Sequence, residues 1–231
     1  MNSEDAAMTA YAIKYDVLQG VLDAEAPTLA EKQRLILNEL PYSWEVHYLT
    51  MVTRRTWLAT IEYNGFSYRY DNYTHYEIHG LEPYSNVIED RVIGVIGRSV
   101  PTPRNKKTAT WLKGLVGPTE MRWGPQFDKG HFVAQTLGGG EQLNIFSQRR
   151  DLNRGRSEAG KNFRRMEKYC FTHPGTLLFH RPIYLEEGAR PAALDFGLLM
   201  DDGKLWVERF DNREIPEGGE FFKNRVARTG R

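Results

Sequence analysis

An alternation of polar with aromatic or apolar residues over 44–79 constrains the fold of this chain more than any other feature. It surrounds Asn64-Gly65, a pair that favours the tight turn of a β-hairpin because both residues tolerate positive φ. We therefore expect a small antiparallel sheet around this turn. Its aromatic side chains can pack on neighbouring helices or stack unpaired nucleic-acid bases, and the scarcity of nearby cations favours packing. Its aromatic members include Trp57, Tyr63, Phe66, Tyr68, Tyr70, Tyr73 and Tyr76.

Helices are predicted before this sheet. Residues 6–22 are weakly periodic in hydrophobicity, and Thr28 with Glu31 forms the pattern of a capping box that opens a helix over 32–40. Pro41 is expected to end that helix, because proline has no backbone N–H to donate and its ring clashes with the preceding turn. The N-terminal part of the chain is therefore expected to combine helices with a hairpin.

The second half of the chain continues this mixture of elements. A basic helix is predicted near 157–171, and the stretches 175–184 and 194–209 are rich in strand-forming residues. Asp201-Asp202-Gly203 interrupts the last stretch with turn residues, so a hairpin is expected there. The whole sequence therefore predicts an α+β protein.

Length and cysteine content limit the class of protein. A chain of 231 residues with 40% hydrophobic content can bury a full core, which favours one domain or one domain with a small extension. The only cysteine, Cys170, excludes an internal disulfide and a multi-cysteine zinc site, as in proteins made in the reducing cytoplasm. Residues 1–10 lack the basic segment of a secretory signal, and no run of 18 apolar residues predicts a membrane span.

Charge is unevenly distributed, although the net charge is only +1. Residues 129–168 contain nine basic and four acidic side chains, and the rest of the chain is acidic on balance. Such a segment can be an ordinary solvated helix face with a charged loop. It can also attract phosphate groups, which is the better interpretation if catalytic residues lie beside it.

Four short motifs follow one another in and around this basic segment. They are Asp128-Lys129-Gly130-His131, Leu143-Asn144, Leu152-Asn153-Arg154-Gly155 and Met166-Glu167. Their order resembles that of the DNA/RNA non-specific endonucleases, the ββα-metal or His-Me finger nucleases, over roughly residues 85–213. The resemblance implies a ββα-metal nuclease core on an antiparallel sheet, with an N-terminal helical and β extension. It also implies a strand over 143–148, and a glycine link at 138–140 between the two strands of the unit.

The resemblance implies roles for three of these residues. An imidazole can accept a proton from water near neutral pH, so His131 is the expected general base. Asn153 is the expected ligand of Mg²⁺, with Mn²⁺ as the alternative cation. Glu167 is expected to orient the water molecules of that cation. The stretch between Gly155 and Glu167 exceeds the usual family spacing by about one and a half helical turns, so Glu158 is the alternative.

The remaining candidates support the catalytic strand or contact substrate. Asn144 is expected to position a loop or the phosphate, and it completes a catalytic set with His131, Glu167 and Lys129. Lys129 stands where many relatives carry arginine, and it offers phosphate a point charge without the bidentate fork of arginine. The expected substrate-binding set is Arg154, Arg156 and Asp128.

The motifs lead to one leading function and two alternatives. We expect an N-terminal extension at 1–80, a nuclease domain at 81–213 and a basic tail at 214–231. The leading interpretation is a metal-dependent, sequence-non-specific endonuclease of DNA, RNA or both, serving as a toxin or defence effector. Its expected partners are nucleic acid and an immunity or carrier protein, with no membrane, and a specialised secretion system would export it. The alternatives are a catalytically inactive nucleic-acid-binding module of the same fold, and an interaction protein with a coincidental motif.

Overall fold

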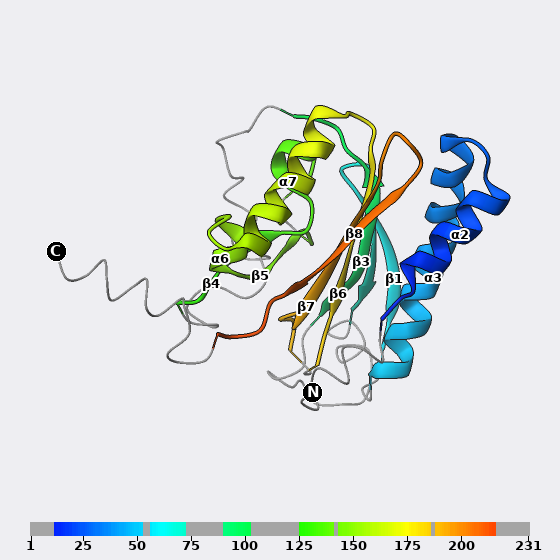
Figure 1. The fold of residues 1–231 in the computed structure, drawn as a ribbon. Helices are drawn as coiled ribbons and strands as arrows, with labels where there is room; N and C mark the ends of the chain where they lie inside the picture. The colour runs from blue at the N-terminus through cyan, green and yellow to red at the C-terminus, as the bar shows by residue number, and fades with distance from the viewer. Residues whose placement is uncertain are drawn as a thin grey trace.

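The computed structural model describes residues 12–52, 56–72, 90–102, 125–140, 143–185 and 188–215, and it combines helices with antiparallel sheet (Figure 1). A six-stranded sheet has the strand order β1-β2-β3-β6-β7-β8, and β4 pairs with β5 in a separate two-stranded sheet. The elements are α2 (Tyr15–Glu25), α3 (Leu29–Met51), β1 (Leu58–Tyr63), β2 (Phe66–Asp71), β3 (Arg91–Arg98), β4 (Phe127–His131), the 3-10 helix η2 (Gln135–Leu137), β5 (Ile145–Arg149), α6 (Arg150–Asn153), α7 (Glu158–Thr172), β6 (Leu177–Ile183), β7 (Ala193–Leu199) and β8 (Leu205–Asp211).

The six-stranded sheet is the middle of three layers. Figure 1 shows α2 and α3 against one face, and the group β4, β5, α6 and α7 against the other. Every residue of β6 and β7 is buried, as expected for strands covered on both faces. In β6, Phe179 packs in the cluster on the side of the N-terminal helices, whereas Leu178 packs in the cluster beneath α7. The alternation of side chains along each strand thus supplies two cores.

The predicted hairpin is confirmed. β1 and β2 pair antiparallel with Tyr63 opposite Phe66, and the turn residues Asn64 and Gly65 have φ of 53° and 80°. Phe66 and Tyr68 are fully buried in the cluster beneath α7, so these two aromatic rings pack in the core and are not available to stack on bases.

The helix that was predicted to end at Pro41 continues to Met51, which corrects that expectation. Leu40, Trp44 and Tyr48 follow one another on a single face of α3 and are buried against the sheet. This burial offsets the roughly 3 kcal/mol that an interior proline costs a helix. The predicted capping box at the start of α3 is present, with Thr28 and Glu31 each accepting a hydrogen bond from the other's backbone.

Gly94 of β3 permits close packing of α3 on the sheet. A Cβ atom at Gly94 would lie 2.2 Å from Cε3 of Trp44, so a larger residue would push the buried indole and its helix away. This close contact between Trp44 and Gly94 packs α3, the helix that contains Pro41, against β3.

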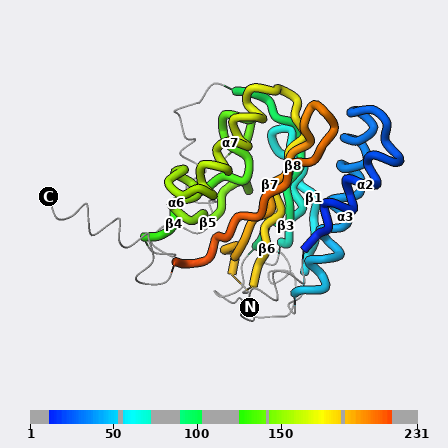
Figure 2. The backbone as a smooth tube through the Cα atoms, viewed as in Figure 1, coloured from blue at the N-terminus to red at the C-terminus, as the bar shows by residue number. Residues whose placement is uncertain are grey.

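The group containing the motifs is inserted between two neighbouring strands of the large sheet. β3 pairs with β6, although β4, β5, α6 and α7 lie between them in sequence. The ends of the insertion meet at Ser99, whose N–H donates to the Thr176 carbonyl (2.9 Å) and whose carbonyl accepts from the Gly175 N–H (2.8 Å). The smooth backbone trace in Figure 2 shows the inserted group gathered on one side of the sheet.

The expected boundary between the N-terminal extension and the nuclease domain, at residue 80, can be compared with the strand order of the large sheet. β1 and β2 precede residue 80, yet they belong to the same sheet as β3, β6, β7 and β8. The boundary expected at residue 80 therefore falls between strands of one sheet.

Of the expected basic tail, residues 216–231 lie outside the described residues. No described helix is both long enough and apolar enough to cross a membrane.

Candidate active site

β4 carries the first motif and pairs antiparallel with β5, which begins directly after the second motif, Leu143-Asn144. Lys129 lies across from Ser147 and His131 across from Ile145, at the end of β4. Gly130 allows this pairing, because a Cβ atom there would lie 2.4 Å from both Cβ and Oε1 of Gln148. The glycine of the Gly-His pair is thus needed for close approach of the two strands, and it fixes the strand that carries His131.

Asn144 is buried beneath the loop that follows His131. Its Oδ1 accepts hydrogen bonds from the Val133 N–H (2.8 Å) and the Tyr68 hydroxyl (3.1 Å). Its Nδ2 donates to the carbonyl oxygens of Val133 (2.7 Å) and Gly140 (2.6 Å). These four bonds use the whole hydrogen-bonding capacity of a carboxamide. Of the two roles expected for Asn144, the structure therefore supports positioning of the loop and leaves no donor or acceptor for the phosphate.

Asp128 is also turned inward. It is buried, and its two oxygens accept from the Arg150 Nε (2.9 Å) and from the Arg154 Nε and Nη2 (2.6 and 2.8 Å). The Asn153 Nδ2 donates to the same carboxylate at 3.3 Å. Both carboxylate oxygens are therefore engaged within the protein, and a contact of Asp128 with substrate stays a prediction. Asp128 anchors residues of α6 on β4.

Asn153 stands at the C-terminal end of α6 with its side chain oriented by Asp128. Because Nδ2 donates to that carboxylate, Oδ1 is directed away from it. Within the described part of the chain no group donates to this oxygen. The backbone carbonyl of Asn153 accepts from the Nη2 of Arg164 on α7. An amide oxygen held in this way is the kind of donor that suits a hard cation.

Glu167, and not Glu158, shares a contact with Asn153. The Glu167 carboxylate accepts from the Nη1 of Arg164 at 2.8 Å, and the same guanidinium reaches the Asn153 carbonyl. Burial raises the pKa of Glu167, and the nearby Arg164 opposes that rise. The Glu158 side chain is 85% exposed and pairs with Lys161 on the same helix. The structure thus brings Glu167 to the end of α6 and leaves Glu158 at the surface.

Three cations lie on or near the surface of this unit. Lys129 on β4 and Arg156 before α7 are exposed, and neither forms an ion pair within the described ranges. Arg154 remains 41% exposed although its guanidinium is bidentate to Asp128. The first two are therefore the better placed of the predicted phosphate contacts, and Arg154 is held in one orientation by Asp128.

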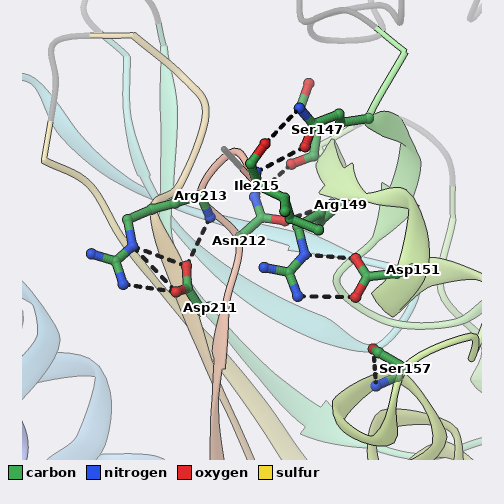
Figure 3. Close-up of polar contacts among 10 residues, drawn as sticks. Ser147, Arg149, Asp151, Ser157, Asp211, Asn212, Arg213 and Ile215 are labelled. Carbon is green, nitrogen blue, oxygen red and sulfur yellow. Dashed lines mark hydrogen bonds and ion pairs between the residues drawn. The ribbon is translucent and has the colours of Figure 1, made fainter. Parts of the chain in front are cut away.

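Asn212, which the sequence did not single out, ties β5 to the large sheet (Figure 3). Its Oδ1 accepts from the Arg149 N–H (2.6 Å), and its Nδ2 donates to the carbonyls of Ser147 and Pro191 (both 2.8 Å). Figure 3 also shows Arg149 in a bidentate pair with Asp151, at 2.6 and 2.9 Å. Burial alone would raise the pKa of Asp151, but the hydrogen bonds and charge of Arg149 lower it. These contacts fix the junction between β5 and α6.

The donors at the α6–α7 junction are compatible with a hard cation that keeps part of its water shell. The oxygen donors that gather there are the Asn153 amide and the Glu167 carboxylate, next to the buried Asp128. Oxygen donors of this type suit Mg²⁺ or Mn²⁺, and Mg²⁺ commonly takes one or two protein ligands and completes its shell with water and phosphate. No cluster of three or more His, Cys, Asp or Glu side chains able to hold a metal occurs among the described residues.

No family model matches the sequence, and no curated relative does. Among solved structures, the chain is similar to one described as the Sda1 nuclease with a bound zinc ion, with 15% identity and a TM-score of 0.34 over 69% of this chain and 74% of that chain. It is also similar to one described as an extracellular endonuclease, with 14% identity and a TM-score of 0.33 over 71% of this chain and 82% of that one. At these values, neither likeness assigns a family or an activity.

Proposed function

We propose that this protein is a metal-dependent, sequence-non-specific endonuclease that hydrolyses phosphodiester bonds of DNA, RNA or both. The observation that carries the proposal is the link between β4, α6 and α7: Asp128 orients Asn153, and Arg164 joins Asn153 to Glu167. β4, β5 and α7 would then be the ββα-metal core of a nuclease of the DNA/RNA non-specific type. His131 lies on the strand that carries Asp128, three residues away.

In the proposed reaction, His131 is the general base. Hydrolysis of a phosphodiester needs an activated water, neutralisation of the phosphate and stabilisation of the leaving oxygen. The imidazole of His131 would remove a proton from the attacking water as that water approaches phosphorus. Asn144 would act indirectly, by holding the Val133–Gly140 loop that follows His131 in a single conformation.

Asn153 and Glu167 are proposed to hold the cation. The Asn153 Oδ1 would be the direct ligand, and the Glu167 carboxylate would accept hydrogen bonds from coordinated water and so orient it. When bound, Mg²⁺ or Mn²⁺ would neutralise charge on the phosphate and the leaving oxygen. Lys129, Arg156 and the partly exposed Arg154 would attract the phosphate backbone without contacting the bases that distinguish one sequence from another.

The biological setting is a further part of the proposal and rests on the sequence resemblance alone. We propose a toxin or defence effector with an immunity or carrier protein as partner, made in the cytoplasm and exported by a specialised secretion system. The alternative molecular function, a catalytically inactive binding module of the same fold, predicts salt-dependent nucleic-acid binding without product.

The test is incubation of the purified full chain with plasmid DNA and with total RNA, in Mg²⁺, in Mn²⁺ and in EDTA. We expect metal-dependent degradation that falls by about 10²- to 10⁴-fold in His131→Ala, because a general base contributes about that much. His173→Ala is the matched control, since His173 lies at the exposed end of α7. Binding without degradation by wild type would favour the inactive module, and equal activity in both variants would exclude His131 as the base.

A further inference from the structure

One guanidinium connects the two helices of the candidate site. Arg164 of α7 donates from Nη1 to the Glu167 carboxylate (2.8 Å) and from Nη2 to the backbone carbonyl of Asn153, at the end of α6. The motifs in the sequence do not include Arg164. A planar fork of fixed donors suits this double contact, which a single ammonium group cannot reproduce with the same geometry.

The backbone around Arg164 is shaped to let the two helices approach. Gly160 lies one turn before Arg164 on α7, and a Cβ atom there would lie 2.4 Å from the Asp151 carbonyl oxygen. Gly155 has a φ of 63°, and a Cβ atom there would lie 3.3 Å from Cγ of Arg164. Two glycines thus bring α6 and α7 together where the Arg164 side chain crosses between them.

Arg165 provides an internal comparison. It is the next residue on the same helix, it is exposed, and it forms no ion pair within the described ranges. Arg164 is itself 51% exposed, so an isolated surface pair with Glu167 would contribute little to stability. Arg164 differs from Arg165 in both of its contacts, and the bond to the Asn153 carbonyl joins it to the residue proposed as the metal ligand.

We propose that Arg164 is a positioning residue for the cation site: it sets the Glu167 carboxylate and the Asn153 turn in one fixed relation. This inference rests on the proposed function and adds a residue to it. It makes a prediction opposite to that of simple electrostatics. A nearby positive charge repels a divalent cation, so removal of the charge alone would tighten cation binding. Loss of positioning weakens binding instead.

The first test is calorimetric titration of the full chain with Mn²⁺ in the absence of nucleic acid. Arg164→Met keeps the length of the side chain and removes its donors, and Arg165→Met removes the same charge one residue away. We expect Arg164→Met to weaken Mn²⁺ binding by about 10- to 100-fold, the usual effect of losing a group that orients a metal ligand. Arg165→Met should bind as wild type does, and Arg164→Lys should recover part of the loss.

The second test separates positioning from direct phosphate contact. With plasmid DNA as substrate, Arg164→Met should need a higher Mg²⁺ concentration for half-maximal cleavage, with KM for DNA unchanged. A raised KM, a shallower salt dependence of DNA binding and unchanged Mn²⁺ affinity would make Arg164 a phosphate contact and overturn the inference. Unchanged or tighter Mn²⁺ binding in Arg164→Met would also overturn it.

The two proposals fail in different ways. If wild type neither binds Mn²⁺ nor cleaves nucleic acid, the proposed function fails and the inference fails with it. If wild type binds and cleaves while Arg164→Met behaves as Arg165→Met does, only the inference fails.

Discussion

At the scale of single residues, the candidate site depends on side chains whose role is to hold other side chains. The side-chain oxygen of Asn144 accepts two hydrogen bonds and its amide group donates two, all of them within the protein. Asp128 likewise serves Arg150, Arg154 and Asn153. Asn144 and Asp128 thus hold other parts of the site, whereas His131 and Asn153 are the residues proposed to take part in the reaction.

Tyr68 offers a test of this separation from outside the motifs. Tyr68→Phe removes one of the two hydrogen bonds to the Asn144 Oδ1 without changing the shape of the buried ring. We expect the free energy of unfolding, measured with urea, to fall by about 1 kcal/mol, together with a lower cleavage rate. Tyr42→Phe is the control because that ring is 67% exposed on α3. Equal behaviour of the two variants would contradict the role assigned to Asn144.

At the scale of elements, local signals in the sequence were reliable where local chemistry decides the outcome. Asn64-Gly65 needs only its own φ angles to make a turn, and Thr28 with Glu31 needs only the first turn of a helix. Pro41 misled, because the cost of an interior proline is local whereas the burial of Trp44 against β3 is not visible in the sequence.

The candidate site shows the same limit on prediction. The motif order placed His131, Asn153 and Glu167 on one unit, and the structure has them on β4, α6 and α7 of the inserted group. The hydroxyl of Tyr68 lies 76 positions from Asn144 in sequence, so no local pattern could have indicated that contact. Arg164 stands three residues before Glu167, a spacing that predicts a helical ion pair but not the second bond to α6.

The pairing of β4 with β5 can be tested at Gly130. Gly130→Ala would place a methyl group within 2.4 Å of the Gln148 side chain, so we expect lower stability in thermal unfolding and a large loss of cleavage. Gly20→Ala is the matched control, because Gly20 lies in α2 with no atom within 4 Å of the added Cβ. In the control, replacement of glycine inside a helix should stabilise the protein by about 0.5–1 kcal/mol. A stabilised Gly130→Ala would contradict the described strand pairing.

At the scale of the whole molecule, the two cores depend on one sheet. The cluster beneath the N-terminal helices includes Trp44 of α3 together with Ile93, Ile96 and Phe179 of the sheet. The hairpin β1–β2 contributes Phe66 and Tyr68 to the opposite core. The N-terminal region thus contributes side chains to the cores on both faces of the sheet.

A chain beginning at residue 81, the expected start of the nuclease domain, should therefore fail to fold. It would lack α2, α3, β1 and β2, expose the helix-covered face of the sheet and leave β3 as an open edge. We expect no cooperative thermal transition by circular dichroism. The full chain is the control and should unfold cooperatively. A cooperative transition in the shorter chain would show that the division at residue 80 is a true domain boundary.

Acid should destabilise the fold through His180. This ring is buried between the sheet and α7, stacked on Phe196 with centroids 4.0 Å apart, and burial lowers its pKa from 6.5 to about 3. Below pH 6.5 the unfolded chain binds a proton that the folded chain does not. The titration of His180 therefore does not affect the free energy of unfolding above pH 6.5. Below that pH it lowers the free energy of unfolding, by up to about 1.4 kcal/mol per pH unit, until the pH approaches 3.

Urea unfolding at pH values from 7 to 4 measures this slope. We expect His180→Leu to reduce this slope, because leucine does not titrate and has a volume similar to that of histidine. His173→Leu, the same substitution at the exposed end of α7, is the control for the chemical change. An unchanged slope in His180→Leu would assign the acid sensitivity to other groups.

The junction at Ser99, where both ends of the inserted group meet, also bears on how this chain reaches its native state. Pairing of β3 with β6 requires residues far apart in sequence to close a long loop. Closure of that loop lowers the entropy of the chain before the stabilising contacts between the strands have formed. Such non-local pairing gives a high contact order, which is associated with slow folding. The hairpin β1–β2 and helix α7 can form early from local contacts, whereas zippering of the sheet at Ser99 is expected to limit the folding rate.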